Sequence, residues 1–221
     1  MYQIIPHKEN MINYNLEMEN LIKTFDDKKT LLLHSCCGPC STAVITRLKD
    51  YFDITVFYYN PCLYPDSEFE KRLNEQIKFI NQINESLENK IKIVAPAYDP
   101  DSFLTKTVGL ENEPEGGARC KVCYADRLNA TFQYAQQHNF DYFGTTLSVS
   151  PYKHADWLNE IGLKLETDKT KYLISDFKKK DGYKLSIDLS KKYHLYRQNY
   201  CGCKYSYLSM LEREKEENKD N

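Results

Sequence analysis

Short apolar runs alternate with longer segments of helical spacing along the first half of the chain. The runs at residues 30–34, 54–59 and 91–95 are typical of buried strands. Residues 41–50 and 66–87 carry apolar side chains three and four positions apart, which predicts helices after the first two strands. Strands that alternate with helices in this way predict an α/β fold with a parallel sheet and right-handed crossovers.

The second half continues the alternation after a less regular stretch. We expect a short helix over 101–110, a long helix over 119–138, a strand over 142–146 and helices over 155–165 and up to about residue 215. Apolar residues before position 30 are too sparse for a core element of their own. We therefore predict one three-layer, Rossmann-like α/β domain over 30–208, with a lead-in over 1–29 and a helix end and acidic tail over 209–221.

Composition favours a packed globule, because 41% of the residues are hydrophobic and 13% aromatic. No apolar run is long enough to cross a bilayer. The first 20 residues are polar and show no secretory signal, so we expect a cytoplasmic protein without a membrane partner. In that compartment thiols stay reduced. Eight cysteines therefore indicate metal, cluster or redox chemistry.

Three of these cysteines, Cys36, Cys37 and Cys40, lie between the first predicted strand and its helix. Gly38 allows a tight backbone there and Pro39 ends the strand pairing. A strand-to-helix turn at the carboxyl edge of a parallel sheet is where open α/β folds bind ligands. Adjacent cysteines do not easily pair with each other. A metal or cluster is therefore the partner that this turn predicts, the alternative being small buried apolar residues.

Cys120 and Cys123 form a C-x-x-C pair at a predicted helix start. Two sulfurs at this spacing can reach one metal centre or form a redox disulfide. Together with Cys36 and Cys37 they make four candidate thiolates, a set that suits either zinc or an iron–sulfur cluster. Spacing alone leaves both alternatives open.

Cys201 and Cys203 form a separate pair across Gly202. A disulfide across one glycine closes a very small ring, which should be strained and easily reduced. The pair therefore suits electron transfer or a second metal ion, which Cys40 could join as a ligand. The remaining cysteine, Cys62, is given no role.

Local basic clusters stand out from a formal net charge of −2. Residues 178–180 and 191–192 are lysines, and they are interleaved with Tyr183, Tyr193 and Tyr196. A basic face with aromatic rings could hold nucleic acid. Ordinary solvated lysines on a helix and loop are the alternative.

Blocks of the sequence, in matching order from about residue 30 to 208, resemble the cobalamin-independent epoxyqueuosine reductase family called QueH. They are His34 to Cys40, Tyr59-Asn60-Pro61, Tyr64-Pro65 with Glu68 and Arg72, Arg119-Cys120-x-x-Cys123-Tyr124 with Arg127-Leu128, Thr145-Thr146-Leu147 with Ser150-Pro151-Tyr152-Lys153, and Tyr196-Arg197-Gln198-x-Tyr200-Cys201-Gly202-Cys203. Family members usually continue Asn-Pro with Asn, so Cys62 departs from the pattern.

This resemblance implies reduction of epoxyqueuosine to queuosine at the wobble position of tRNA. It implies a four-iron, four-sulfur cluster on Cys36, Cys37, Cys120 and Cys123. Cys201 and Cys203 would be the redox-active pair or, when reduced, would bind a nearby iron or other metal ion. The partners implied are tRNA carrying epoxyqueuosine and an unidentified electron donor.

The reaction removes an epoxide oxygen with two electrons and two protons, and it needs a Lewis acid or proton donor. Candidate donors or substrate-positioning groups are His34, Asp66, Tyr152, Lys153 and Tyr200. His34 could equally be a hydrogen-bonded histidine at a strand end. Arg127 and Arg197 could contact phosphate or pair with carboxylates.

Two other functions fit parts of the sequence. A zinc-stabilised, non-catalytic tRNA-binding module would explain four thiolates but not Cys201 and Cys203. An ATP-dependent enzyme that transfers sulfur to tRNA would use the same sheet. The first thiol block does resemble the phosphate-loop position of the adenine-nucleotide α-hydrolase-like (HUP) folds, but cysteines replace the residues that would cradle phosphate.

Overall fold

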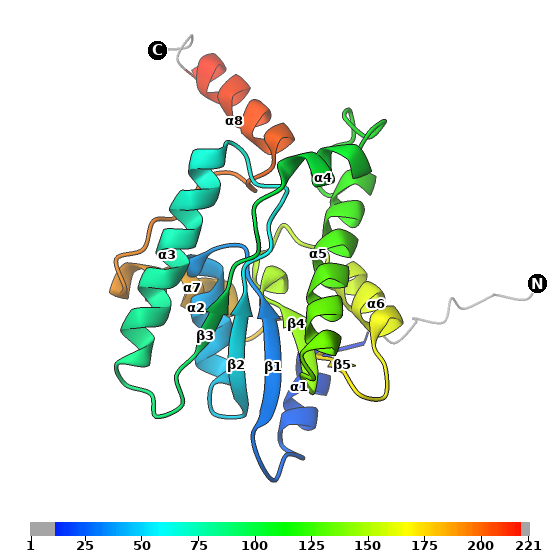
Figure 1. Ribbon diagram of the computed structural model, residues 1–221. Coiled ribbons are helices and arrows are strands. Elements are labelled where there is room, and N and C mark those ends of the chain that lie inside the picture. Colours follow the sequence, from blue (N-terminus) through cyan, green and yellow to red (C-terminus); the bar gives the residue numbers. More distant parts are fainter. Residues whose placement is uncertain (1–11, 218–221) are drawn as a thin grey trace, which may run out of the picture.

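The computed structural model describes residues 12–217, which form a five-stranded sheet between two layers of helices (Figure 1). The strands are β1 (Lys29–His34), β2 (Phe52–Phe57), β3 (Lys92–Val94), β4 (Tyr142–Thr145) and β5 (Lys171–Tyr172). They pair in the order β3-β2-β1-β4-β5, and every pair is parallel. The predicted α/β fold with a parallel sheet is confirmed. The sequence did not indicate β5, because two residues carry no periodicity.

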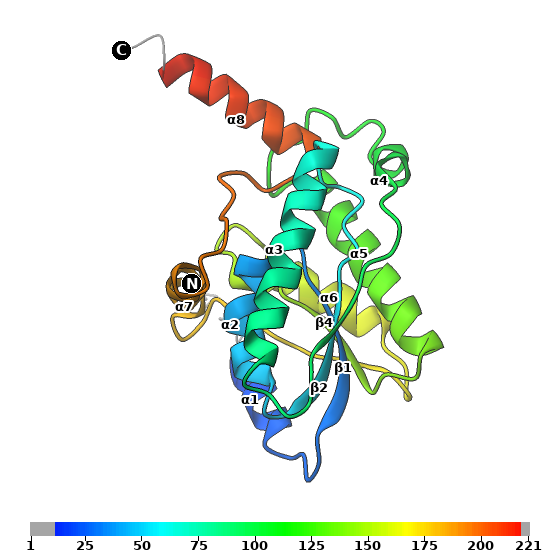
Figure 2. The ribbon, with the colours of Figure 1, turned by 60° about the vertical axis from the view of Figure 1, so that its left-hand side comes forward.

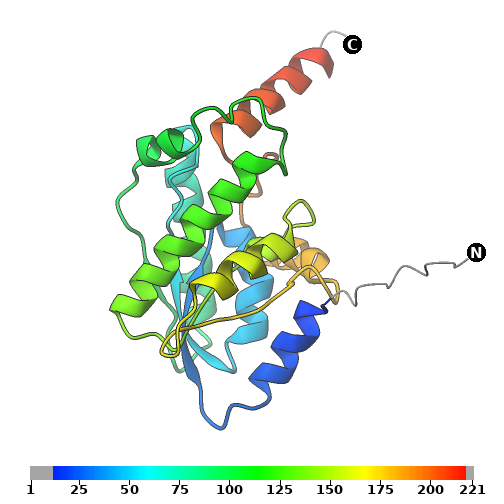
Figure 3. The same ribbon diagram turned by 90° about the vertical axis from the view of Figure 1, so that its right-hand side faces the viewer.

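The helices divide between the two faces of the sheet (Figures 1 and 3). One face packs against α1 (Tyr14–Ile22), α2 (Gly38–Leu48), α3 (Asp66–Asn84) and α7 (Gly182–Lys192). The other packs against α5 (Ala118–Gln137) and α6 (Ala155–Leu165). Two further helices, α4 (Pro100–Lys106) and α8 (Lys204–Glu217), lie toward the end to which the strands point, and the 3₁₀ turn η1 (Leu147–Val149) follows β4.

The core is organised around β1, whose leucines alternate between the two layers. Leu31 and Leu33 pack into the core shared with α2 and α3, while Leu32 packs against α5. All three are fully buried. Full burial of a leucine side chain stabilises a fold by about 1.5–3 kcal/mol relative to exposure, so a central strand needs apolar residues on both faces.

The lead-in contributes more to the core than its sequence predicts. Met18 and Ile22 of α1 are buried in the core beside α2, which corrects the expectation that apolar residues before position 30 are too sparse for a core element of their own. A nine-residue helix buries only one face, so two apolar residues four positions apart are enough to pack that face against the core. Residues 1–11 of the lead-in and 218–221 of the acidic tail lie outside the described range.

Helix α2 begins three residues earlier than the predicted Ser41. Pro39 lies in its first turn, where a missing N–H costs nothing. Gly38 is helical as well, and a Cβ atom there would lie 2.7 Å from the carbonyl oxygen of Glu75 in α3. The glycine therefore permits close packing of α2 on α3. As a result of the earlier helix start, all three thiols of this turn lie at the N-terminus of α2.

Strand register aligns the carboxyl ends of β1, β2 and β4 at one edge of the sheet. His34 at the end of β1 lies opposite Phe57 of β2 and Thr145 of β4. The chain after α7 then runs along α3 and returns to this edge before α8 begins (Figure 2). Within residues 12–217, no helix combines the length and hydropathy required to cross a membrane.

Candidate functional site

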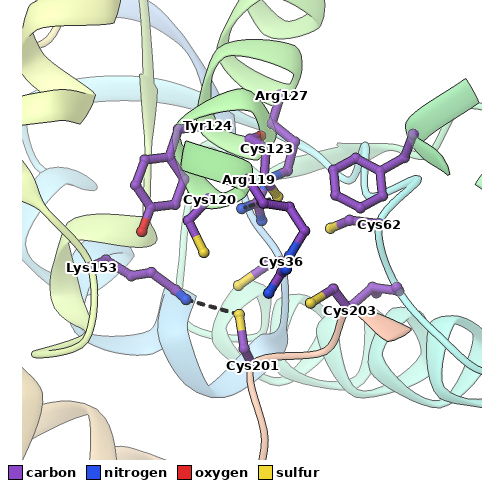
Figure 4. Close-up of a pocket in the computed structure, with 12 residues that line it drawn as sticks. Cys36, Cys62, Arg119, Cys120, Cys123, Tyr124, Arg127, Lys153, Cys201 and Cys203 are labelled. Carbon is purple, nitrogen blue, oxygen red and sulfur yellow. Dashed lines mark hydrogen bonds between the residues drawn. The ribbon is translucent and has the colours of Figure 1, made fainter. Parts of the chain in front are cut away.

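A pocket at the carboxyl edge of the sheet collects six of the chain's eight cysteines (Figure 4). They are Cys36, Cys62, Cys120, Cys123, Cys201 and Cys203. The other two, Cys37 and Cys40, lie beside Cys36, and the three sulfur atoms are within 4.8 Å of one another. The cavity between these side chains has a volume of about 20 Å³, room for about one water molecule. All eight thiols are free and gather at one place.

Local structure explains how the first two thiol groups reach the pocket. Cys36 follows β1, Cys37 is the N-cap of α2 and Cys40 lies in its first turn. Cys120 and Cys123 are three residues apart in the first turns of α5, so they share one face of that helix. Both helix N-termini point their positive dipole ends at this edge, which favours thiolates.

Three sulfur atoms of these groups accept hydrogen bonds from N–H donors. Gln198 Nε2 lies 3.4 Å from Cys37 Sγ, and the Gly116 amide lies 3.2 Å from Cys120 Sγ. Arg127 Nη2 lies 3.0 Å from Cys123 Sγ. Donors of this kind stabilise the ionised form of a thiol and orient sulfur ligands around a metal.

Arg127 is buried, with 4% of its surface exposed, and has a thiol rather than a carboxylate as its side-chain partner. None of the ion pairs formed among residues 12–217 involves it. Burial lowers the pKa of its guanidinium, but nearby thiolates, Cys123 first, outweigh that effect and raise it. A buried cation requires a compensating negative charge. The sulfur atoms are the groups placed to carry that charge.

The three thiols at the start of α2 differ in their pKa values. Cys36 Sγ lies 3.8 Å from Cys37 Sγ. Thiol donors at Cys36 and Cys40 hold the pKa of Cys37 well below its usual range, while the same contacts raise the pKa of Cys36 and of Cys40. The group therefore stabilises one thiolate even without a metal.

A separate set of contacts fixes the segment that carries Cys201 and Cys203. Arg72 of α3 donates to the Cys201 carbonyl at 3.1 Å and forms a buried ion pair with Glu68 at 2.7 Å. Leu63 and Cys203 form a single antiparallel bridge. These contacts hold both thiols toward the pocket, as Figure 4 shows.

Lys153 connects the other wall of the pocket to this segment. Its Nζ lies 2.8 Å from Cys201 Sγ and 3.5 Å from Glu115. Burial raises the pKa of Cys201, and the lysine charge opposes that shift. Lys153 and Arg127, both expected from the sequence to contact substrate, do line the pocket.

Five other candidate residues lie outside the pocket lining. His34 is fully buried, with its ring nitrogens 2.9 Å from Thr145 Oγ1 and 3.1 Å from the Tyr59 carbonyl, the arrangement of a strand-end histidine. Arg197 reaches the Ser186 carbonyl and Ser190 Oγ of α7. The others are Tyr200, which donates to the Tyr64 carbonyl, Asp66, which accepts from Tyr98, and Tyr152, which is 72% exposed.

Five residues of the pocket lining were not predicted from the sequence: the apolar Leu63 and Phe103, and Cys62, Arg119 and Tyr124. Cys62 follows the loop after β2, so its place at the carboxyl edge was a usable signal. Arg119 and Tyr124 flank the C-x-x-C pair at the start of α5. Arg119 Nε and the Tyr124 hydroxyl are buried and have no hydrogen-bond partner among the described residues.

Comparisons with known proteins agree with this thiol site. A sequence model of the family described as "Epoxyqueuosine reductase QueH" matches residues 31–209. A protein named epoxyqueuosine reductase QueH from Staphylococcus epidermidis is 37% identical, over 96% of this chain and 92% of its own. Proteins of the same name from Streptococcus pyogenes serotype M1 and Thermotoga maritima are 38% and 31% identical, over 88% and 85% of this chain and 78% and 95% of their own.

Proposed function

The chain belongs to the epoxyqueuosine reductase QueH family, and we propose that it reduces epoxyqueuosine to queuosine in tRNA at the cysteine-lined pocket. It is an oxidoreductase. The observation that carries the proposal is the gathering of the cysteines at the carboxyl edge of the sheet, six of them in the lining of one pocket and the other two beside Cys36. We also propose that the sheet resembles the HUP fold and that the protein is cytoplasmic.

The proposed cofactor is a four-iron, four-sulfur cluster on Cys36, Cys37, Cys120 and Cys123. Three features of the site support it: thiols from two helix starts, N–H donors on three of the four sulfurs, and the buried Arg127 that needs a negative partner. Such a cluster transfers single electrons at low potential. Arg127, Gln198 and the Gly116 amide would orient the ligands and favour their ionised form.

Cys201 and Cys203 are proposed as the two-electron group. Two thiols that form a disulfide release two electrons and two protons, which is what an epoxide requires to become an alkene and water. An electron donor, unidentified, would then reduce the disulfide. When reduced, the pair could instead bind a second metal ion together with Cys40, and an open coordination position there would polarise the leaving oxygen.

The chain's own residues have defined roles in this proposal. Lys153 favours the thiolate of Cys201, and Arg72 holds the backbone that carries the pair. Phe103 and Leu63 supply apolar surface to the pocket lining and so help to limit water at the reacting atoms. The lysines at 178–180 and 191–192 are proposed contacts for tRNA phosphates.

An anaerobic assay tests the function directly. Protein purified without oxygen is mixed with a chemical reductant and an anticodon stem-loop that carries epoxyqueuosine, and nucleoside analysis measures queuosine. We expect a brown protein with about four iron and four sulfide per chain and turnover without ATP. A colourless zinc protein without turnover would favour the tRNA-binding module, and an ATP requirement would favour sulfur transfer.

Single serine variants test the ligand set in the same preparation. Replacement of Cys36, Cys37, Cys120 or Cys123 by Ser should each strongly reduce iron content. Cys62→Ser is the matched control, because Cys62 lines the same pocket but is not assigned as a ligand. Full iron content in any of the four variants would remove that residue from the set.

A further inference from the structure

The hydroxyl of Tyr124 is an unused polar group inside the pocket. Its side chain lines the pocket and is 1% exposed. The hydroxyl is buried and forms no hydrogen bond with any group among residues 12–217. Buried polar groups nearly always have a partner, so each exception calls for an explanation. Here the pocket itself is the space into which a partner could enter.

The surroundings fix where this hydroxyl points. The Tyr124 ring packs in the core cluster with Leu128 and Leu158, and its centroid lies 6.5 Å from that of Trp157. Figure 4 shows the hydroxyl end of the ring directed toward the Lys153 side chain, whose amino group contacts Cys201. The phenol is therefore held in place by apolar packing, and its polar end lies beside Lys153, the residue that contacts Cys201.

The proposed substrate carries a hydrogen-bond acceptor that could pair with this hydroxyl. An epoxide oxygen accepts hydrogen bonds but donates none, and a phenol is a donor. Negative charge develops on this oxygen as a carbon–oxygen bond breaks, so a fixed donor stabilises the transition state more than the bound substrate. The product, an alkene, has no acceptor at this position.

We propose that Tyr124 is a substrate-binding residue whose hydroxyl donates a hydrogen bond to the epoxide oxygen of the bound nucleoside. This inference rests on the proposed function, since it assigns a role within that reaction. Tyr124 is then both a specificity residue, which separates substrate from product, and a catalytic residue, which contacts the reacting oxygen.

Tyr172 provides a matched control. Its hydroxyl is also buried without a partner among the described residues, but Tyr172 lies in β5 and does not line the pocket. Tyr→Phe at either position removes one oxygen that bonds to nothing in the protein. Both variants should therefore fold and retain iron.

The test measures binding to anaerobically purified protein without an electron donor, so that no turnover occurs. The probes are two anticodon stem-loops, one with epoxyqueuosine and one with queuosine. Wild-type protein and Tyr172→Phe should bind the epoxide form about fivefold more tightly, the equivalent of one neutral hydrogen bond. Tyr124→Phe should lose this preference, and with reductant its kcat should fall at least tenfold.

Two results would overturn the inference: no preference in wild-type protein, or an unchanged preference in Tyr124→Phe, whether or not the cluster spectrum of that variant is altered. A retained preference together with an altered cluster spectrum would mean that the Tyr124 hydroxyl interacts with the cluster and not with the substrate. Failure of the proposed function is a separate result, since it would appear as no queuosine formation by wild-type protein in the reductant assay.

Discussion

The ammonium nitrogen of Lys153 lies 2.8 Å from the thiol sulfur of Cys201, across 48 positions of sequence. Among residues 12–217 Cys203 has no such cationic neighbour, and its sulfur instead lies 3.5 Å from the hydroxyl of Ser206. The two thiols of the pair are therefore not equivalent. Cys201 is the one whose thiolate has a cationic partner, so it is the one expected to react first with an electrophile.

Replacement of Lys153 by Met should slow alkylation of Cys201. Burial raises the pKa of this thiol and Lys153 opposes the rise, so the variant should ionise only at higher pH. A thiol pKa that is higher by about one leaves roughly tenfold less thiolate at neutral pH. Iodoacetamide labelling of reduced, metal-free protein across pH, read by mass spectrometry, measures this shift. Lys164→Met, which removes an exposed lysine of α6, should leave the profile unchanged.

Replacement of both Cys201 and Cys203 by Ser should abolish epoxide reduction while iron and sulfide stay at wild-type content. The pair comes from the segment before α8, separate from the four proposed cluster ligands. Iron analysis and the queuosine assay with a strong reductant test this together. Lost iron would mean that the pair also holds the cluster, and retained turnover would mean that the pair is structural.

Gly202→Ala should displace the thiol pair. Gly202 has φ +123°, and an added Cβ would lie 2.5 Å from Leu63 and 2.6 Å from Arg72 Nη1. Gly109→Ala is the control, because Gly109 also has positive φ, +82°, but has no atom within 4 Å of the added Cβ. Backbone strain alone costs about 1–2 kcal/mol. Thermal unfolding should show that loss in both variants, while turnover should fall only in Gly202→Ala.

The buried His34 should make the protein less stable in acid. Burial, followed by the charge of Arg127, lowers its pKa from 6.5 to about 4. Between these values the unfolded chain binds a proton that the folded chain does not. Stability is therefore complete above pH 6.5 and is lost as pH falls toward 4, by about 3 kcal/mol.

Urea unfolding of metal-free protein at pH 7 and pH 4.5 measures this loss. The difference should shrink in His34→Gln and stay the same in His138→Gln, which changes an exposed histidine just after α5. An equal difference in wild type and His34→Gln would assign the acid sensitivity to other groups.

Neutralising Lys179, Lys191 and Lys192 should weaken tRNA binding and flatten its salt dependence. These three side chains are exposed, whereas Lys178 and Lys180 have carboxylate partners in Asp176 and Glu19. Each lost phosphate contact should reduce the slope of log affinity against log salt by about 1. Fluorescence titrations at several salt concentrations test this, with Lys164→Ala as control. An unchanged slope would identify the lysines as ordinary solvated residues.

The parallel sheet and the thiol character of the site follow from the order of residues along the chain. Apolar runs such as Leu31 to Leu33 can be buried on both faces only in a covered sheet, so their spacing with the intervening helices defines the fold class. Cysteines directly after a strand, or one helical turn apart, are placed by local geometry alone. The sequence therefore places Cys36 and Cys37 at the carboxyl edge of the sheet and Cys120 and Cys123 on one face of a helix start, two sites that an α/β sheet could bring together.

Which side chains meet at that edge depends on tertiary packing. Cys62, Tyr124 and Lys153 enter the pocket because strand register and helix packing bring their segments together, while Arg197 turns away to α7. The segment that carries Cys201 has no periodic pattern, and its position depends on Arg72, which is 129 residues away in sequence. Contacts of this kind form between backbone and side chains distant along the chain, so neither spacing nor composition encodes them.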